Sequence, residues 1–244
     1  MKIKLFTIPN MLTLSNLLCG SFAVVSALVY RDLELSFWLI ILAAVFDFFD
    51  GFAARLLHIP SAIGVELDSL ADMISFGLAP AAIFYTLYAD AATLWTWSEQ
   101  TLWIGSWCVF ILAAFSALRL AKFNIDDTQT TEFCGLPTPA CALFCASLGL
   151  LTVQGSLEMS KEVIVAVAVI FACLLISPVR MFSFKFHGFG WHGNALRYLF
   201  MVGCVMLIVW LHYVAVPLII VSYIVISAVR WIRMRCASKS CAKA

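Results

Sequence analysis

Four aspartates at fixed spacing are the residues of this sequence best suited to chemistry. Asp47 and Asp50 lie three positions apart in one apolar segment, and Asp68 and Asp72 lie four positions apart in the next. On α-helices, both spacings put the paired carboxylates on one face. If the two segments pack as a hairpin, all four carboxylates meet at one point. Because Mg²⁺ and similar cations bind carboxylate oxygens, the pattern favours a divalent-metal site.

A metal site would also balance the charge of these aspartates. A carboxylate in a membrane span costs roughly 2.5 to 3.5 kcal/mol on insertion scales, and Arg55 is a single nearby positive charge. One or two divalent cations would restore the balance, and paired metal ions assist phosphoryl displacement. Gly51 and Gly64 lack side chains where a substrate or the partner helix must come close. The alternative is a polar seam between two spans, as in the ion pathway of a transporter.

The composition is that of a membrane protein. Of the 244 residues, 64% are hydrophobic and 12% are charged, and apolar runs long enough for a membrane-spanning helix recur along the chain. We expect one all-α domain over residues 1–244, a polytopic membrane bundle of about eight transmembrane helices. A nucleic-acid partner is not expected. Hydropathy places the spans at about 10–30, 34–57, 65–89, 101–121, 138–155, 162–178, 196–211 and 213–232.

The basic residues are distributed unevenly among the expected loops. With a cytoplasmic N-terminus, 13 of the 15 Lys and Arg residues fall on the cytoplasmic side, and only Arg31 and Lys161 face outward. By the positive-inside rule, both termini are therefore expected in the cytoplasm. Residues 233–244 would form a basic cytoplasmic tail, and the basic stretch Arg230–Arg235 is expected to contact anionic lipid headgroups. All four aspartates then lie toward the cytoplasmic side, so the acidic site is expected to face the cytoplasm.

The first apolar run carries a polar stripe. Asn10, Thr13 and Asn16 recur every three residues, a spacing that suits either hydrogen bonds to another helix or contact with a ligand. Lys2 and Lys4 before an apolar run would also suit a signal peptide. A cleaved leader needs only an apolar run, however, so the polar stripe argues against a signal peptide.

Residues 47–72 read D-x-x-D-G-x-x-A-R-x8-G-x-x-x-D-x-x-x-D. This string is similar to the signature of the CDP-alcohol phosphatidyltransferases at every fixed position. Stretches outside it resemble one branch of that family, the CDP-diacylglycerol–serine O-phosphatidyltransferases. These stretches begin at Pro9, Ser75, Ala117, Gly135 and Ser177. The resemblance covers about residues 8 to 185.

The resemblance implies transfer of a phosphatidyl group from CDP-diacylglycerol to L-serine, which gives phosphatidylserine and CMP. It implies Mg²⁺ or Mn²⁺ held by Asp47, Asp50, Asp68 and Asp72, with Asp72 also acting as the general base. It further implies a homodimer embedded among the lipids of the bacterial cytoplasmic (inner) membrane. The alternative within the family is an enzyme with another acceptor, such as glycerol 3-phosphate or inositol phosphate, or with an archaeal-type lipid donor.

The resemblance also implies two groups of substrate-binding residues. The residues expected at CDP-diacylglycerol are Asn10, Thr13, Gly51, Ala54, Arg55 and Gly64. The carboxylate of serine needs a cation, and several basic residues lie on the expected cytoplasmic side. The candidates for serine binding are Arg119, Lys122, Arg180, Ser183 and Lys185.

Overall fold

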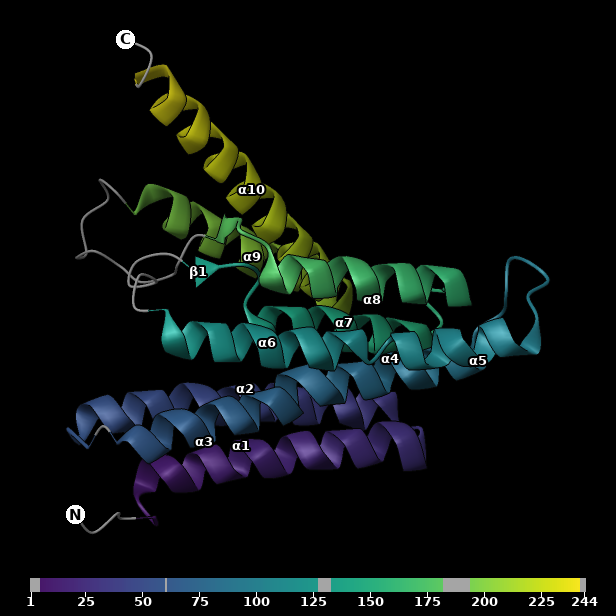
Figure 1. The fold of residues 1–244 in the computed structure, drawn as a ribbon, viewed down its shortest axis with the longest axis horizontal. Helices are drawn as coiled ribbons and strands as arrows, with labels where there is room; N and C mark the ends of the chain where they lie inside the picture. The colour runs from purple at the N-terminus through teal and green to yellow at the C-terminus, as the bar shows by residue number, and fades with distance from the viewer. Residues whose placement is uncertain (1–4, 60, 127–132, 182–193, 242–244) are drawn as a thin grey trace.

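The computed structural model describes residues 5–59, 61–126, 133–181 and 194–241, which form an almost wholly helical bundle (Figure 1). The all-α prediction is confirmed. The described strands are β1 (Phe133–Cys134) and β2 (Arg180–Met181), which form one short antiparallel pair. The helical elements are α1 (Ile8–Val25), η1 (Ser26–Tyr30), α2 (Leu33–Leu56), α3 (Ala62–Asp72), η2 (Met73–Leu78), α4 (Ala79–Asp90), α5 (Glu99–Cys108), α6 (Ile111–Ile125), α7 (Thr138–Val153), α8 (Lys161–Ile176), α9 (Ala195–Leu211), η3 (His212–Val214) and α10 (Ala215–Cys241).

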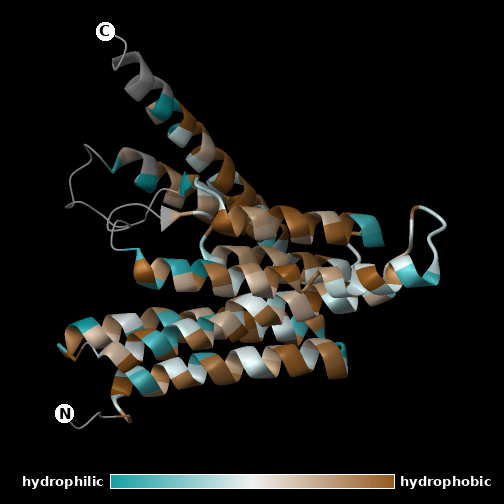
Figure 2. Ribbon diagram, in the orientation of Figure 1, coloured by the Kyte–Doolittle hydropathy of each residue, from teal (hydrophilic) through white to brown (hydrophobic). Residues whose placement is uncertain are grey.

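Within the described part of the chain, 5 helical segments are long and apolar enough to cross a membrane. They are Ile8–Tyr30, Leu33–Leu56, Ala62–Asp90, Glu99–Ile125 and Arg197–Arg235. Hydrophobic residues cover the middle of the bundle, and hydrophilic residues lie mainly toward its ends (Figure 2). The chain is therefore an integral membrane protein. Each expected range overlaps a helix, although some run past helix ends, such as those of α7 and α8. The count of about eight transmembrane helices stays a prediction.

Helix α1 is an integral part of the bundle. It packs against α2 and α3 on one side of the molecule (Figure 1), while α2 also packs against α7, and α10 packs against α7. The segment Ala62–Asp90 runs through the interior, and 72% of an apolar 18-residue stretch within it is buried. A cleaved leader would leave α2 and α3 without this neighbour, so the contacts of α1 oppose the signal-peptide interpretation.

The long interior segment contains a π-helical turn. It is η2, which joins α3 to α4 directly after Asp72, and such turns occur frequently at functional sites. Within η2, the Ser75 hydroxyl donates to the Asn16 carbonyl of α1 at 3.0 Å. Gly77 faces α6, where an added Cβ would lie 3.0 Å from Cβ of Ser116. η2 and α6 therefore approach each other closely at Gly77.

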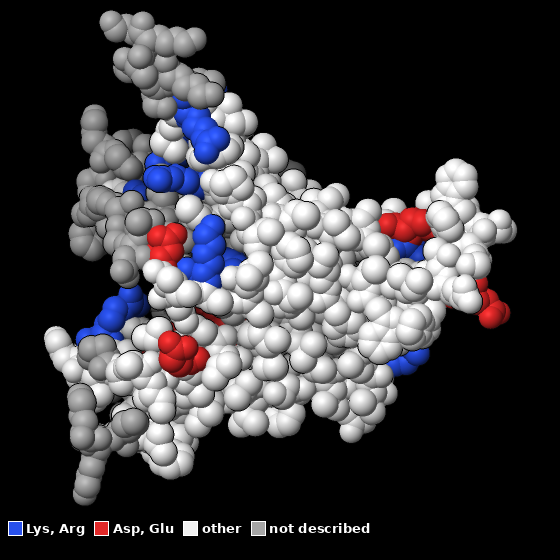
Figure 3. Space-filling model, in the orientation of Figure 1, with Lys and Arg blue, Asp and Glu red and all other residues white. Residues whose placement is uncertain are grey.

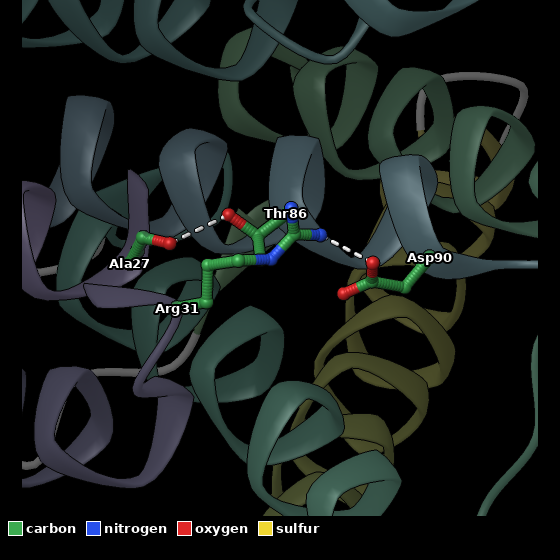
Figure 4. Close-up of polar contacts among 4 residues, drawn as sticks. All are labelled: Ala27, Arg31, Thr86 and Asp90. Carbon is green, nitrogen blue, oxygen red and sulfur yellow. Dashed lines mark hydrogen bonds and ion pairs between the residues drawn. The ribbon is translucent and has the colours of Figure 1, made fainter. Parts of the chain in front are cut away.

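The end of the bundle away from the two termini is held by polar contacts between loops and helix ends. Arg31, after η1, forms an ion pair with Asp90 at the end of α4, and Thr86 donates to the Ala27 carbonyl at 2.8 Å (Figure 4). The hydrogen bond to Asp90 raises the pKa of the Arg31 guanidinium above its ordinary value. Charged side chains gather at both ends, with an uncharged band between them (Figure 3). This distribution suits a membrane-spanning bundle.

The packing between α1 and η2 predicts a strong effect at Gly20. A Cβ at this position would lie 2.6 Å from Cα of Ser75, which is backbone and cannot rotate away. We expect Gly20→Ala to lower the free energy of unfolding by about 1 to 3 kcal/mol, as overpacking usually does. Thermal unfolding of the purified protein in detergent measures the effect.

Gly203→Ala is the matched control for this substitution. Gly203 lies within α9 and has no atom within 4 Å of an added Cβ. Since alanine favours a helix over glycine by about 1 kcal/mol, the control is expected to keep or raise the melting temperature. Equal melting temperatures for the two variants would mean that the contact between Gly20 and Ser75 does not set this packing.

Candidate active site

Three of the signature carboxylates converge between α2 and α3. One carboxylate oxygen each from Asp47, Asp50 and Asp68 lies within 4.8 Å of the others. Asp50 is buried, and the other two are half-buried. The buried Oδ1 of Asp68 has no hydrogen-bond partner, and leaving such an atom unpaired is costly. A cation that prefers oxygen ligands would satisfy it and offset the three charges, so these residues fit a divalent metal ion.

The fourth carboxylate lies beside this group and is held by α1. Asp72 is 8% exposed, and its Oδ1 accepts a hydrogen bond from Nδ2 of Asn16 at 3.1 Å. The Thr13 hydroxyl donates in the same way to Oδ2 of Asp50 at 2.6 Å. Two members of the polar stripe therefore bond to the neighbouring helices. Asn16 was not among the predicted site residues, although its spacing from Thr13 was the signal that could have identified it.

Most residues expected at CDP-diacylglycerol surround one cavity between α1, α2 and α3. The cavity has a volume of about 150 Å³ and is bounded in part by Asp50 and Asp68. The predicted residues that line it are Asn10, Thr13, Gly51, Ala54 and Gly64. Arg55 is exposed, and its Nε donates to the Gly51 carbonyl at 3.0 Å. A Cβ at Gly64 would lie 3.4 Å from Oδ1 of Asn10, so a side chain there would narrow the cavity.

Among the serine candidates, Arg119 is the buried one. It is 8% exposed, and its Nη1 donates to the Thr138 hydroxyl of α7 at 3.1 Å. Its charge lies within electrostatic range of Asp72, while its buried Nε has no hydrogen-bond partner. Lys122 and Arg180 are exposed. Ser183 and Lys185 lie outside the described residues.

A larger cavity, of about 630 Å³, lies at the opposite end of the bundle. Its lining includes the Arg31–Asp90 ion pair together with Glu158 and apolar side chains such as Leu33 and Leu87. The paired charges there already satisfy each other, and the lining contains no converging group of carboxylates. The acidic group between α2 and α3 is therefore the candidate active site, although its cavity is smaller.

A comparison with known families agrees with this choice of site. The sequence profile described as CDP-alcohol phosphatidyltransferase matches residues 6–174, a range that includes all four aspartates and Arg119. The chain belongs to the CDP-alcohol phosphatidyltransferase family. The chain is thus an enzyme of a known class, and the transporter interpretation is set aside.

Relatives of this phosphatidyltransferase occur in bacteria and archaea. A protein of Bacillus subtilis is 38% identical over 132 residues, which are 54% of this chain and 69% of that protein. One of Helicobacter pylori is 32% identical over 191 residues, 74% of each chain. One of Methanocaldococcus jannaschii is 30% identical over 234 residues, 94% of this chain and 96% of that protein. Each is named CDP-diacylglycerol–serine O-phosphatidyltransferase.

The three converging carboxylates predict stabilisation of this phosphatidyltransferase by divalent ions. A ligand that binds only the folded state raises its stability by about 2.7 kcal/mol at one hundred times its Kd. We expect Mn²⁺ or Mg²⁺ to raise the melting temperature of the purified protein, and chelator to reverse the shift. Asp68→Asn should lose most of the shift, because it removes the charge next to the unpaired oxygen.

Glu66→Gln is the matched control for Asp68→Asn. Glu66 is an exposed acidic residue on the same helix and lies outside the converging group. The control should therefore keep the full metal-induced shift. A shift that survives in Asp68→Asn, or one that is lost equally in both variants, would contradict a metal site at these carboxylates.

Proposed function

We propose that this chain transfers the phosphatidyl group of CDP-diacylglycerol to the hydroxyl of L-serine, which releases CMP. The observation that carries the proposal is the converging group of three carboxylates with Asp72 held beside it, because that arrangement suits displacement at a diphosphate. The names of the relatives support serine as the acceptor. The reaction forms one phosphorus–oxygen bond to serine and breaks the one to CMP.

The metal ligands in this proposal are Asp47, Asp50 and Asp68, with Asp72 completing the set. A bound Mg²⁺ or Mn²⁺ would neutralise charge on the diphosphate and on the departing CMP. The protein's part is to hold the carboxylates in place before the substrate arrives. Thr13 does so by its hydrogen bond to Asp50, and preorganised groups of this kind need little rearrangement during the reaction.

Asp72 is the proposed general base. Since Asn16 donates to its Oδ1, Oδ2 is the oxygen that takes the proton from the serine hydroxyl. The serine oxygen then attacks the phosphorus on the diacylglycerol side, and the electron pair of the broken bond leaves with CMP. Asn16 acts as a positioning residue, because its hydrogen bond fixes the rotation of the carboxylate.

The cytidine diphosphate is proposed to bind at the cavity between α1, α2 and α3. Its volume of about 150 Å³ is smaller than the range of about 300 to 1,000 Å³ for typical ligand sites, so it accommodates part of the nucleotide. Gly51 has no side chain and Ala54 has a small one, so the nucleotide can come close to the backbone of α2 there. Asn10 of α1 lines the same cavity. Arg55, at the exposed end of α2, is placed by this proposal at a phosphate oxygen.

The membrane orientation and the oligomeric state belong to the same proposal. The charge distribution supports a site on the cytoplasmic side of the bacterial inner membrane, because the basic residues favour that side. In Figure 1 both termini lie at one end of the bundle, which agrees with two cytoplasmic termini. A homodimer stays a prediction, which the mass of the purified protein in detergent would test.

An acceptor screen tests the proposed function directly. Purified enzyme with CDP-diacylglycerol and a divalent ion is expected to release CMP only when serine is present. Glycerol 3-phosphate and inositol phosphate should give less than a hundredth of that rate. Stoichiometric formation of phosphatidylserine and CMP is measured with labelled serine. A faster rate with either phosphorylated alcohol would assign the chain to a different branch of the family.

Asp72→Asn tests whether Asp72 acts as the general base or only helps to form the binding site. The asparagine can still accept the hydrogen bond from Asn16 through Oδ1, so the local packing is preserved, but it cannot take a proton. We expect kcat to fall by about 10² to 10⁴, as loss of a general base usually costs. The melting temperature should change little. A kcat above a tenth of that of the wild type would rule out Asp72 as the base.

A further inference from the structure

The guanidinium of Arg119 is buried but only partly satisfied. Its Nη1 donates to the Thr138 hydroxyl at 3.1 Å, whereas its Nε is buried and has no hydrogen-bond partner. Leaving a buried charged donor unsatisfied costs more than leaving a neutral one. Because Nη1 is committed to Thr138, the edge formed by Nε and Nη2 is left for a ligand. The two parallel N–H groups on such an edge match a carboxylate.

Two contacts between α6 and the segment α3–η2 fix the place of Arg119 in the bundle. Nδ2 of Asn124 donates to the Ser69 hydroxyl at 2.9 Å, and Ser116 lies against Gly77. The two contacts are separated by the same number of residues on both segments. The segments therefore run antiparallel in matching register, and Arg119 lies between the two contacts.

This register brings Arg119 close to the level of Asp72. Arg119 follows Ser116 by one helical turn, on the face of α6 that meets η2. Counted from the contact between Ser116 and Gly77, Arg119 and Asp72 differ by about 3 Å along the helix axis, at about 1.5 Å per residue. In serine, only Cα and Cβ separate the carboxylate carbon from the hydroxyl oxygen. One serine molecule can therefore bind Arg119 through its carboxylate and present its hydroxyl to Asp72.

The segment before α7 fixes the position of Thr138. Thr138 is fully buried and begins α7. Just before it, the backbone N–H groups of Gly135 and Leu136 donate to the carbonyls of Val179 and Leu174 at 2.9 and 3.0 Å. These bonds attach the start of α7 to the end of α8 and to the residues that follow it. The Thr138 hydroxyl is therefore held in place as an acceptor for Arg119.

The surroundings of Arg119 also favour an anion. Helix α7 has 16 residues, and its N-cap residue, Pro137, provides no side-chain hydrogen bond. A helix N-terminus of this kind favours a nearby negative charge. The guanidinium carbon also lies over the ring of Phe123, 6.0 Å from its centroid. Arg119 is thus positioned before a ligand arrives, and such preorganisation lowers the cost of binding.

We propose that Thr138 is a positioning residue for the acceptor: its hydroxyl holds Arg119 so that the edge of Nε and Nη2 binds the carboxylate of an amino acid. This inference rests on the proposed function, because it assumes an amino-acid acceptor whose hydroxyl reacts at Asp72. It deepens that function by choosing one cation among the basic candidates. It also assigns a role to a threonine that lies outside the aspartate signature.

Thr138→Val tests the inference, because valine keeps the shape of threonine and lacks the hydroxyl. In the full-length enzyme in detergent, we expect the KM for serine to rise about tenfold, which corresponds to about 1.4 kcal/mol. The kcat and the KM for CDP-diacylglycerol should stay within twofold of wild type. Thr138→Ser keeps the hydroxyl and should restore the serine KM.

Thr152→Val is the matched control for this substitution. Thr152 lies near the other end of α7, where its hydroxyl donates to the Leu148 carbonyl at 2.9 Å. The control removes the same group from the same helix, far from Arg119, and should behave as wild type. Arg119→Lys should raise the serine KM at least as much as Thr138→Val, because an ammonium lacks the planar fork that binds a carboxylate.

Serinamide identifies the group that is bound, because it keeps the serine hydroxyl and amine but lacks the carboxylate. In the wild type, the KM for serinamide should be at least tenfold above the KM for serine. With serinamide as the acceptor, wild type and Thr138→Val should have KM values within twofold of each other. An equal loss with both acceptors would overturn the inference, because that pattern indicates packing.

The remaining outcomes distinguish this inference from the proposed function. If the wild type uses serine and Thr138→Val leaves the serine KM within twofold, the inference is overturned while the proposed function stands. If Thr138→Val does not fold, Arg119→Lys carries the test, and a serine KM within twofold of wild type overturns the inference. If CMP release by the wild type does not depend on serine, both the proposed function and the inference fail.

Discussion

The structure depends on keeping carboxylates inside an apolar bundle. Burying an unpaired ion costs several kcal/mol. The neighbouring helices must therefore supply hydrogen-bond donors, and a bound cation would offset the negative charge. Helix α1 supplies two of the donors, Thr13 to Asp50 and Asn16 to Asp72. The two sides of α1 therefore differ: one exposes apolar side chains such as Leu18 and Phe22, and the other carries the hydrogen bonds that hold carboxylates of α2 and α3.

The sequence predicted the parts of this site that depend on local spacing. Two helices with aspartates at i, i+3 and i, i+4 were expected to form a hairpin, and three of these carboxylates do converge. Sequence alone could not choose Arg119 over Lys122, because both lie near the end of α6. Only the tertiary structure, in which Arg119 donates to Thr138 of α7, shows which one is buried. The role of Asn16 depends on how α1 is rotated, which tertiary contacts decide.

The proposed nucleotide cavity and the buried serine candidate come from different helices. The cavity lies between α1, α2 and α3, whereas Arg119 comes from α6 and donates to Thr138 of α7. Such a division allows the acceptor side to vary during evolution without disturbing the residues that hold the diphosphate, because the two sets share no helix.

The π-helical turn η2 has a consequence for how this chain tolerates change. An α-helix rotates by about 100° per residue, whereas a π turn closes its hydrogen bonds one residue further along the chain. It therefore fits one additional residue into nearly the same rotation between Asp72 and α4. Before the turn, the carboxylates face α1 and α2; after it, α4 buries almost every side chain. Loss of one residue from 73–78 would therefore convert η2 into an α-helical turn and leave α4 close to its present rotation. The same loss within α3 would rotate everything after it by about 100°, so this turn tolerates a change of length that the helix before it does not.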